Sequence, residues 1–177
     1  MVKKRKKQEG IDYGNNFIYL FKQEGGINMS YGYFKGNQQQ RPQQRKPDID
    51  YFNQVEKDYA TTAENAIKNI KTNSLPSTSS IRNILALINN VSMKVANCQE
   101  NALPQDVMND ISYLKVRLAY IYGRGQADRR LQSTSDFIDR TKLLELLLCV
   151  DTKKKYEIFA KYVEALIAYH KYYGGRD

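Results

Sequence analysis

The residues best suited to chemistry lie between Tyr113 and Arg124, where tyrosine and arginine alternate at steps of four, three and four residues. On a helix that turns about 100° per residue, they fall on one stripe about 60° wide, formed by Tyr113, Arg117, Tyr120 and Arg124. Arginine pairs with phosphate oxygens, and tyrosine stacks on an unpaired base or covers a ribose. This Tyr/Arg stripe predicts a track for single-stranded nucleic acid. A solvated flank, with the tyrosines half buried against a neighbouring helix, fits the spacing equally well.

Catalytic chemistry is not indicated by the remaining polar residues. His170 is the only histidine, and its place in the last turn of a predicted helix favours a packed or capping role. Asp136 and Asp139 have a spacing that could hold a metal, but an aspartate near a helix start more often complements the helix dipole. Zinc-protease, EF-hand and P-loop motifs are absent, and Gly123–Gly125 is too short for a phosphate-binding loop. We therefore predict no enzyme, no metal and no cofactor.

The charge of the chain points to a polyanionic partner. Its 177 residues carry 28 Lys and Arg against 19 Asp and Glu, a net charge of +9. Residues 51–177 hold 18 of the basic and 14 of the acidic residues, so this part alone has a net charge of +4. Nucleic acid is the expected partner of such a chain, and an anionic membrane surface a less frequent one. A charge of this size also serves simple solubility.

No run of apolar residues is long enough to span a membrane, and the basic N-terminus is not followed by the apolar stretch of a secretory signal. Cys98 and Cys149 lie far apart and form no C-x-x-C pair. The reducing cytoplasm is the expected location, and membrane association is not expected.

The first fifty residues differ from the rest in composition. They contain the basic run Lys3–Lys7 and the stretch Gln38–Pro47, in which Gln, Pro and basic residues show no apolar periodicity. Such a segment does not bury enough apolar surface to offset the entropy of ordering. The aromatic segments Phe17–Phe21 and Tyr31–Phe34 could pair as strands or dock onto a neighbour. We expect residues 1–50 to be a basic, largely disordered extension.

From Tyr51 onward, apolar residues recur at helical spacing. The first helix reaches Ile70 and is followed by a break around Pro76. The next begins with Ser79 or Ser80 as its N-cap, and another has Pro104 in its first turn and ends at Gly123 and Gly125. The last two helices are expected from Ser135 or Asp136 to Leu148, and from about Lys153 to Tyr173. The predicted fold class is therefore all-α, with about five helices in an antiparallel bundle over residues 51–177.

Three of these helical segments resemble one known family in wording, order and spacing. They are Ser79–Met93 (SSIRNILALINNVSM), Asp110–Arg124 (DISYLKVRLAYIYGR) and Phe159–Gly174 (FAKYVEALIAYHKYYG). They look like the signature helices of the small subunit of the type III-A CRISPR–Cas effector, the Csm complex. The resemblance covers roughly residues 75–175 and does not extend to the N-terminal extension.

This resemblance implies a non-catalytic small subunit of an antiviral ribonucleoprotein interference complex. Members stack in several copies along a filament, beside the guide-backbone subunit and the large polymerase-like subunit. They contact the duplex of guide RNA and target RNA without cutting it. The family's basic positions correspond here to Arg82, Lys115, Arg117, Arg124, Lys161 and Lys171. To these RNA-binding candidates, the stripe adds Tyr120.

Three other functions fit parts of the sequence. A purely structural helical subunit could bridge partner proteins without touching RNA, because apolar runs such as Leu143–Val150 suit a protein interface as well as a core. The small subunit of type III-B effectors is also helical. A small metal-dependent RNA-processing enzyme would depend on Asp136 or Asp139.

Overall fold

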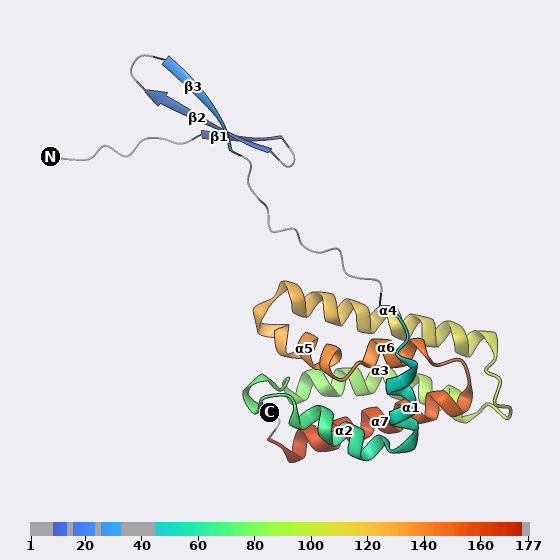
Figure 1. The fold of residues 1–177 in the computed structure, drawn as a ribbon. Coiled ribbons are helices and arrows are strands. Elements are labelled where there is room, and N and C mark those ends of the chain that lie inside the picture. Colours follow the sequence, from blue (N-terminus) through green and yellow to red (C-terminus); the bar gives the residue numbers. More distant parts are fainter. Residues whose placement is uncertain (1–8, 14–15, 24–25, 33–44, 175–177) are drawn as a thin grey trace. The chain divides into compact units, whose positions relative to one another are not determined.

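The computed structural model describes residues 9–13, 16–23, 26–32 and 45–174, and the chain divides into two units, Met1–Gln43 and Gln44–Asp177 (Figure 1). In the first unit, β1 (Glu9–Tyr13), β2 (Asn16–Gln23) and β3 (Gly26–Gly32) form an antiparallel sheet in the order β1-β2-β3. Ile18 in β2 is the register partner of Ile11 on one side and of Tyr31 on the other. The aromatic segments therefore pair as strands, which the sequence had left open. The rest of the predicted disordered extension up to residue 44 lies outside the described residues.

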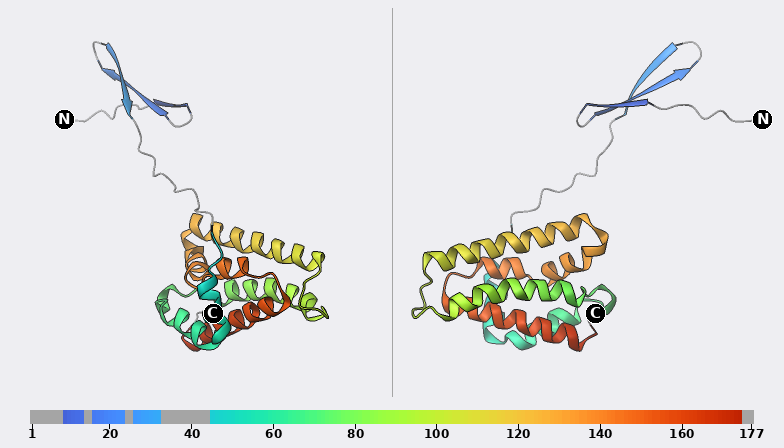
Figure 2. Two further views of the ribbon diagram at one scale, coloured as in Figure 1. Left: turned by 45° about the vertical axis from the view of Figure 1, so that its right-hand side comes forward. Right: turned by 180° about the vertical axis from the view of Figure 1, so that it is seen from behind.

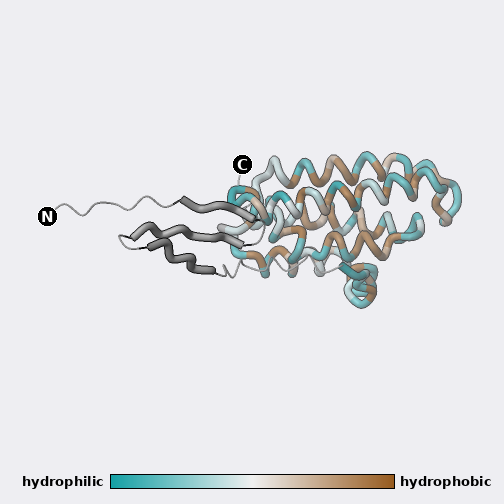
Figure 3. The backbone as a smooth tube through the Cα atoms, turned by 90° about the horizontal axis from the view of Figure 1, so that it is seen from above, coloured by the Kyte–Doolittle hydropathy of each residue, from teal (hydrophilic) through white to brown (hydrophobic). Residues whose placement is uncertain are grey.

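The second unit is helical, as predicted. Its elements are α1 (Ile49–Lys57), α2 (Tyr59–Lys68), η1 (Thr72–Ser74), α3 (Thr78–Ala96), α4 (Gln105–Ala127), η2 (Arg129–Leu131), α5 (Gln132–Arg140), α6 (Leu143–Leu148) and α7 (Lys153–Tyr172). The helix α3 packs against α4 on one side and α7 on the other (Figure 2). Hydrophobic and hydrophilic residues alternate along the helical tubes, as one-sided helices require (Figure 3).

The core lies where the apolar stripes of the helices meet. From the predicted stripes, Ile81, Ile84, Leu118, Phe159 and Leu166 are almost fully buried. Two tyrosines are also buried, and their hydroxyl groups join neighbouring elements through hydrogen bonds. Tyr156 donates to the carbonyl of Ile88 at 2.7 Å, which fixes α7 to α3, and its burial raises its pKa to about 12. A buried hydroxyl without a hydrogen-bond partner would cost stability. These bonds therefore favour the one relative position of the helices in which both hydroxyl groups find their partners.

The described residues form seven α-helices where about five were predicted, because two predicted helices are interrupted. Asp58 ends α1 and begins α2, with a non-helical backbone and a carboxylate that accepts a hydrogen bond from the Thr61 amide at 3.0 Å. This is an N-cap, which the apolar period running through it had concealed. The break between α5 and α6 lies at Lys142, whose φ of 54° places it in the left-handed region. A helix cannot continue through that conformation.

Several predicted helix ends were wrong. Gly123 and Gly125 do not end α4, which continues to Ala127. The N-cap of α3 is Ser77, whose hydroxyl accepts a hydrogen bond from the Ser80 amide at 3.3 Å. The α5 helix begins at Gln132, before the predicted cap at Ser135 or Asp136.

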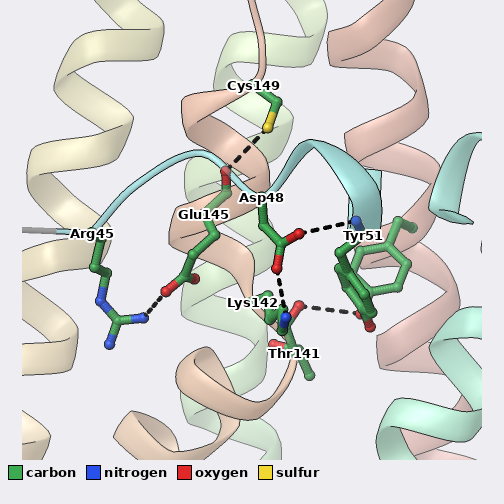
Figure 4. A network of polar contacts seen from close by, with 8 residues as sticks. Arg45, Asp48, Tyr51, Thr141, Lys142, Glu145 and Cys149 are labelled. Atoms are coloured by element: carbon green, nitrogen blue, oxygen red, sulfur yellow. Dashed lines mark hydrogen bonds and ion pairs between the residues drawn. The ribbon is translucent and has the colours of Figure 1, made fainter. Parts of the chain in front are cut away.

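The segment before α1 is held against the bundle by a polar network (Figure 4). Lys142 donates to Asp48 at 2.6 Å, and the same carboxylate caps α1 by accepting from the Tyr51 amide at 3.0 Å. Arg45 forms ion pairs with Asp139 and Glu145. The hydrogen bonds from Lys142 and from the Tyr51 amide hold the pKa of Asp48 below its usual value. The network therefore favours the ionised form of Asp48 in the folded protein.

We predict that Asp48→Asn lowers the melting temperature modestly at neutral pH and not in acid. Asparagine keeps the cap but loses the charge pair, which at a partly exposed site is worth up to about 1 kcal/mol. Because the folded-state pKa is depressed, this stability is present above the unfolded pKa of about 3.9 and is lost as pH falls through the lower folded value. Thermal unfolding of both proteins across this range checks the prediction. A difference in melting temperature that does not change with pH would contradict it.

Candidate nucleic-acid interface

The Tyr/Arg stripe lies on the solvent side of α4. Four apolar residues of this helix are buried against the core, namely Val107, Ile111, Leu114 and Leu118. Tyr113 is 62% exposed and Tyr120 is 58% exposed, so the interpretation in which they are half buried against a neighbour is wrong. The Arg124 guanidinium lies 6.0 Å from the centre of the Tyr120 ring, at the limit of a cation–π contact. The stripe therefore presents aromatic faces and guanidinium groups to solvent.

The stripe borders α3. Lys94, near the end of α3, forms an ion pair with Asp110 of α4 at 2.6 Å. Arg117 and Arg124 follow Asp110 at intervals of seven residues, which return to nearly the same side of a helix. Arg82, one of the predicted contacts, is exposed on α3. The α3 helix and the stripe thus share one side of the bundle, where α4, α3 and α7 lie in that order (Figure 2).

Three cations on this side form no ion pair within the described part of the chain, although Lys94 there pairs with Asp110, and Arg124, after Arg130, contributes to lowering the pKa of Asp128. From Ile111 to Ala127 the chain has three basic residues and no acidic one. Among the described residues, neither Arg82, Arg117 nor Arg124 forms an ion pair, whereas many cations elsewhere do: Lys68 with Glu64, Lys142 with Asp48, Lys154 with Glu56, and Lys155 with Asp151. Unneutralised guanidinium groups are available to an external anion. We call this side, with Arg82, Arg117, Tyr120 and Arg124, the α3/α4 face.

A pocket of about 310 Å³ opens on the α3/α4 face, between the start of α3 and the end of α4. Its lining residues come from four elements and are Ser79, Ser80, Asn83, Ile121, Arg124, Leu131 and Thr134. Sequence reasoning found only Arg124 among them. The serines are hydrogen-bonded to the N-cap, with 3.0 Å from each hydroxyl to that of Ser77. The sequence signal for the pocket is the polar first turn of α3, where Ser79 and Ser80 are also the predicted N-cap candidates.

Lys115 does not belong to the α3/α4 face. It is two residues from Arg117, which places the two side chains about 160° apart around α4. Tyr122, seven residues after Lys115, is on the same edge of the helix and carries the Arg45 guanidinium 4.3 Å above its ring. The structure therefore separates Lys115 from the other predicted contacts on α4.

The two predicted contacts on α7 also differ from each other. Lys161 is exposed, but Glu157 and Glu164 lie one turn away on the same exposed side, so its positive field is offset. Lys171 is in the last turn of α7, beside His170. The His170 Nε2 atom lies 2.8 Å from the carbonyl oxygen of Pro76, just before α3. Lys171 is thus near the start of α3, at the same end of the bundle as the pocket.

The residues considered for catalysis have structural surroundings. His170 is buried, and its ring meets that of Phe137 edge-on, which confirms the packed role. Asp139 forms an ion pair with Arg45 at 2.8 Å, and Asp136 is half buried in α5. Within the described part of the chain, no three His, Cys, Asp or Glu residues gather as metal ligands would. None of the helices described there is both long and apolar enough to cross a membrane.

Comparison with known proteins identifies relatives of one kind. A CRISPR system Cms protein Csm2 of Enterococcus italicus is 43% identical over 99 residues, which cover 54% of this chain and 66% of that protein. A protein of the same name from Streptococcus thermophilus is 33% identical over 127 residues, covering 70% of this chain and 97% of that protein. In Mycobacterium tuberculosis, a further protein of this name is 31% identical over 101 residues, covering 56% of this chain and 77% of that protein.

The family model described as Csm2 Type III-A matches residues 53–176, which include α2 to α7 and the whole α3/α4 face. This is the family predicted from the three helical segments, and the type III-A model supports that assignment rather than type III-B. With a match over more than half of its length, the chain belongs to the Csm2 Type III-A family.

Proposed function

We propose that this chain is the non-catalytic small subunit of a type III-A CRISPR–Cas ribonucleoprotein interference complex, and that its α3/α4 face binds the RNA backbone. The observation that carries the proposal is the set of unpaired cations, Arg82, Arg117 and Arg124, beside the exposed ring of Tyr120. Guanidinium groups bind phosphates without regard to sequence, and an aromatic ring stacks on any base. We place this activity in residues 51–177, and not in the extension formed by residues 1–50.

Sequence-independent contacts suit a subunit whose target is chosen by a guide. Guide RNA pairing selects the target RNA, so a protein beside the duplex has to hold the backbone and leave the base edges alone. Each contact is then modest, and affinity rises when several copies stack along a filament next to the guide-backbone and large polymerase-like subunits. In this proposal Lys161 and Lys171 make peripheral contacts, and Lys115 meets a different partner surface. A cytoplasmic location follows from this assignment.

A bridging role without RNA contact is the second candidate, because the same helix exposes apolar surface. Val116 is 63% exposed between Tyr113 and Tyr120, and Met93 on α3 is 70% exposed. Exposed large apolar side chains favour contact with protein. A bridging subunit would use this surface for neighbouring subunits and leave the arginines in solvent.

Site-specific photocrosslinking in the assembled complex separates the two candidates. A photoreactive residue at position 120 is expected to capture RNA, because the proposed track passes over the Tyr120 ring. The matched control is the same residue in place of Tyr59, which is 40% exposed on α2. Capture of protein alone from position 120 would contradict RNA binding and favour the bridging role.

A further inference from the structure

The pocket on the α3/α4 face has a polar floor, apolar walls and a charged rim. Thr134, at the floor, is only 4% exposed. Ile121 and Leu131 are half buried and form the walls, and Arg124, Ser79 and Asn83 are exposed around the rim. Small-molecule sites have volumes of about 300–1,000 Å³, so a pocket of 310 Å³ suits a group no larger than one nucleotide.

Thr134 as a residue is almost fully buried, and its hydroxyl makes no hydrogen bond to any residue that the structure describes. The hydroxyl oxygen itself is open to the pocket, because among the described residues only Glu145 Oε2 is a fully buried polar side-chain atom without a partner. Threonine side chains in helices commonly bond to a backbone carbonyl one turn earlier, as Thr141 does with the carbonyl of Phe137 at 2.6 Å. A hydroxyl that makes no such bond and faces a pocket is left to bond a ligand or a water molecule there. Because Thr134 lines the pocket, the group that completes it has to enter the pocket and carry a hydrogen-bonding atom.

The rim adds the features of an anion site. The Arg124 guanidinium has no carboxylate within ion-pair distance among the described residues. Ser79 lies in the first turn of α3, a helix of 19 residues, where amide groups point outward and the helix dipole favours negative charge. A phosphate at the rim would bind Arg124 and the start of α3. A sugar ring between the apolar walls would bring a hydroxyl group to Thr134.

We propose that this pocket binds one ribose-phosphate unit of the RNA strand, with the phosphate at Arg124 and Ser79 and the ribose 2′-hydroxyl at Thr134. This rests on the proposed function and goes beyond it, because the pocket would make the subunit select RNA over DNA. The 2′-hydroxyl is the group that distinguishes the two, and phosphate contacts alone do not detect it. Thr134 thereby becomes the residue that distinguishes RNA from DNA, and Ser79 and Asn83 belong to the rim around the phosphate.

Two substitutions in α3 test the rim. Asn83→Asp places a carboxylate there, and Asn90→Asp adds the same charge seven residues later, on the same exposed side of α3 but outside the pocket. Single-stranded RNA binding by the full chain is expected to weaken about tenfold with Asn83→Asp and far less with Asn90→Asp, since a carboxylate beside a phosphate is repelled at short range. Equal losses would show that only the net charge matters, and would overturn the proposal.

The floor is tested by removing and then restoring one hydroxyl. Thr134→Val is expected to lower affinity for RNA about three- to tenfold, the value of one buried hydrogen bond, and to leave the affinity for DNA of the same sequence unchanged. Thr134→Ser keeps the hydroxyl and is expected to keep the preference for RNA. Thermal unfolding verifies that each variant is folded. An equal loss of RNA and DNA binding, or a preference for RNA that survives Thr134→Val, would overturn the proposal.

The outcomes also separate this proposal from the proposed function. A chain that binds no RNA contradicts both. A chain that binds RNA through Arg117 but is indifferent to Asn83→Asp and Thr134→Val keeps the function and loses the pocket. Titration with free AMP examines the other source of a ribose phosphate. AMP binding that Asn83→Asp abolishes, with RNA binding unaffected, would make this a free-nucleotide site and overturn the assignment to the RNA strand.

Discussion

Replacing both Arg117 and Arg124 by alanine is expected to weaken the binding of single-stranded RNA by the full chain about 10- to 100-fold. A hydrogen bond to a charged group contributes about 1.5–3 kcal/mol, and solvent screening at an exposed site reduces this to about 1 kcal/mol. The loss of two such contacts therefore costs about 1.4–2.8 kcal/mol, a factor of about 10 to 100. Both side chains are exposed and make no ion pair within the described residues. Alanine is also the strongest helix former, so α4 should remain intact. Fluorescence anisotropy with a labelled RNA gives the two dissociation constants.

The matched control removes the same charge from another part of the bundle. Lys57 in α1 and Lys71 after α2 are exposed, and neither α1 nor α2 is among the elements in close contact with α4. Lys57→Ala/Lys71→Ala therefore reduces the net charge by two without touching the α3/α4 face. It is expected to weaken binding only slightly, through the long-range field. Equal losses in the two double variants would mean that RNA is attracted by total charge and has no preferred surface.

Gly125→Ala is expected to destabilise the bundle by about 1–3 kcal/mol, the usual cost of overpacking a close contact. A Cβ atom at Gly125 would lie 2.5 Å from the Cβ of Ser135 and 2.8 Å from the carbonyl oxygen of Leu131. A backbone oxygen cannot move aside as a long side chain can, so η2 and α5 would have to shift. The melting temperature, followed by circular dichroism, should fall by several degrees.

Gly123 supplies the control for this prediction within the same helical turn. Apart from its chain neighbours and the backbone of its own helix, nothing lies within 4 Å of a Cβ atom placed at Gly123. Gly123→Ala should therefore show only the helix propensity of alanine and stabilise the protein by about 0.5–1 kcal/mol. Opposite signs at the two positions support the packing explanation. Destabilisation of equal size at both would indicate that this part of α4 requires flexible backbone instead.

The two glycines also show what the sequence could and could not predict. Apolar periodicity identified the helical segments and their buried sides, though not all of their ends, because each helix buries one side and local spacing records which side. It did not reveal that Gly125 leaves the space into which Ser135 packs, since that contact depends on how two helices pack. The capping carboxylate of Asp58 was missed for the opposite reason. The apolar pattern continues across it, although the backbone there does not.

Only the part of the candidate site that lies on a single helix could be predicted from the sequence. The Tyr/Arg stripe follows from residue spacing in α4, and its exposure in the structure agrees with a contact surface. The pocket was not predictable, because Ser79, Arg124 and Thr134 are brought together from three helices. The resemblance contributed Lys115, Lys161 and Lys171 by position in a motif. The structure places Lys115 on another edge of α4, which no motif could show.

The salt dependence of RNA binding tests the central claim most directly. If the α3/α4 face binds phosphates, the logarithm of the association constant falls linearly with the logarithm of the salt concentration, by about 0.7 for each phosphate contact on a single strand. The account predicts a steep slope for the parent protein and a slope shallower by about 1.4 for Arg117→Ala/Arg124→Ala, since two contacts are removed. RNA binding that is insensitive to salt, or slopes that are identical in the two proteins, would contradict it.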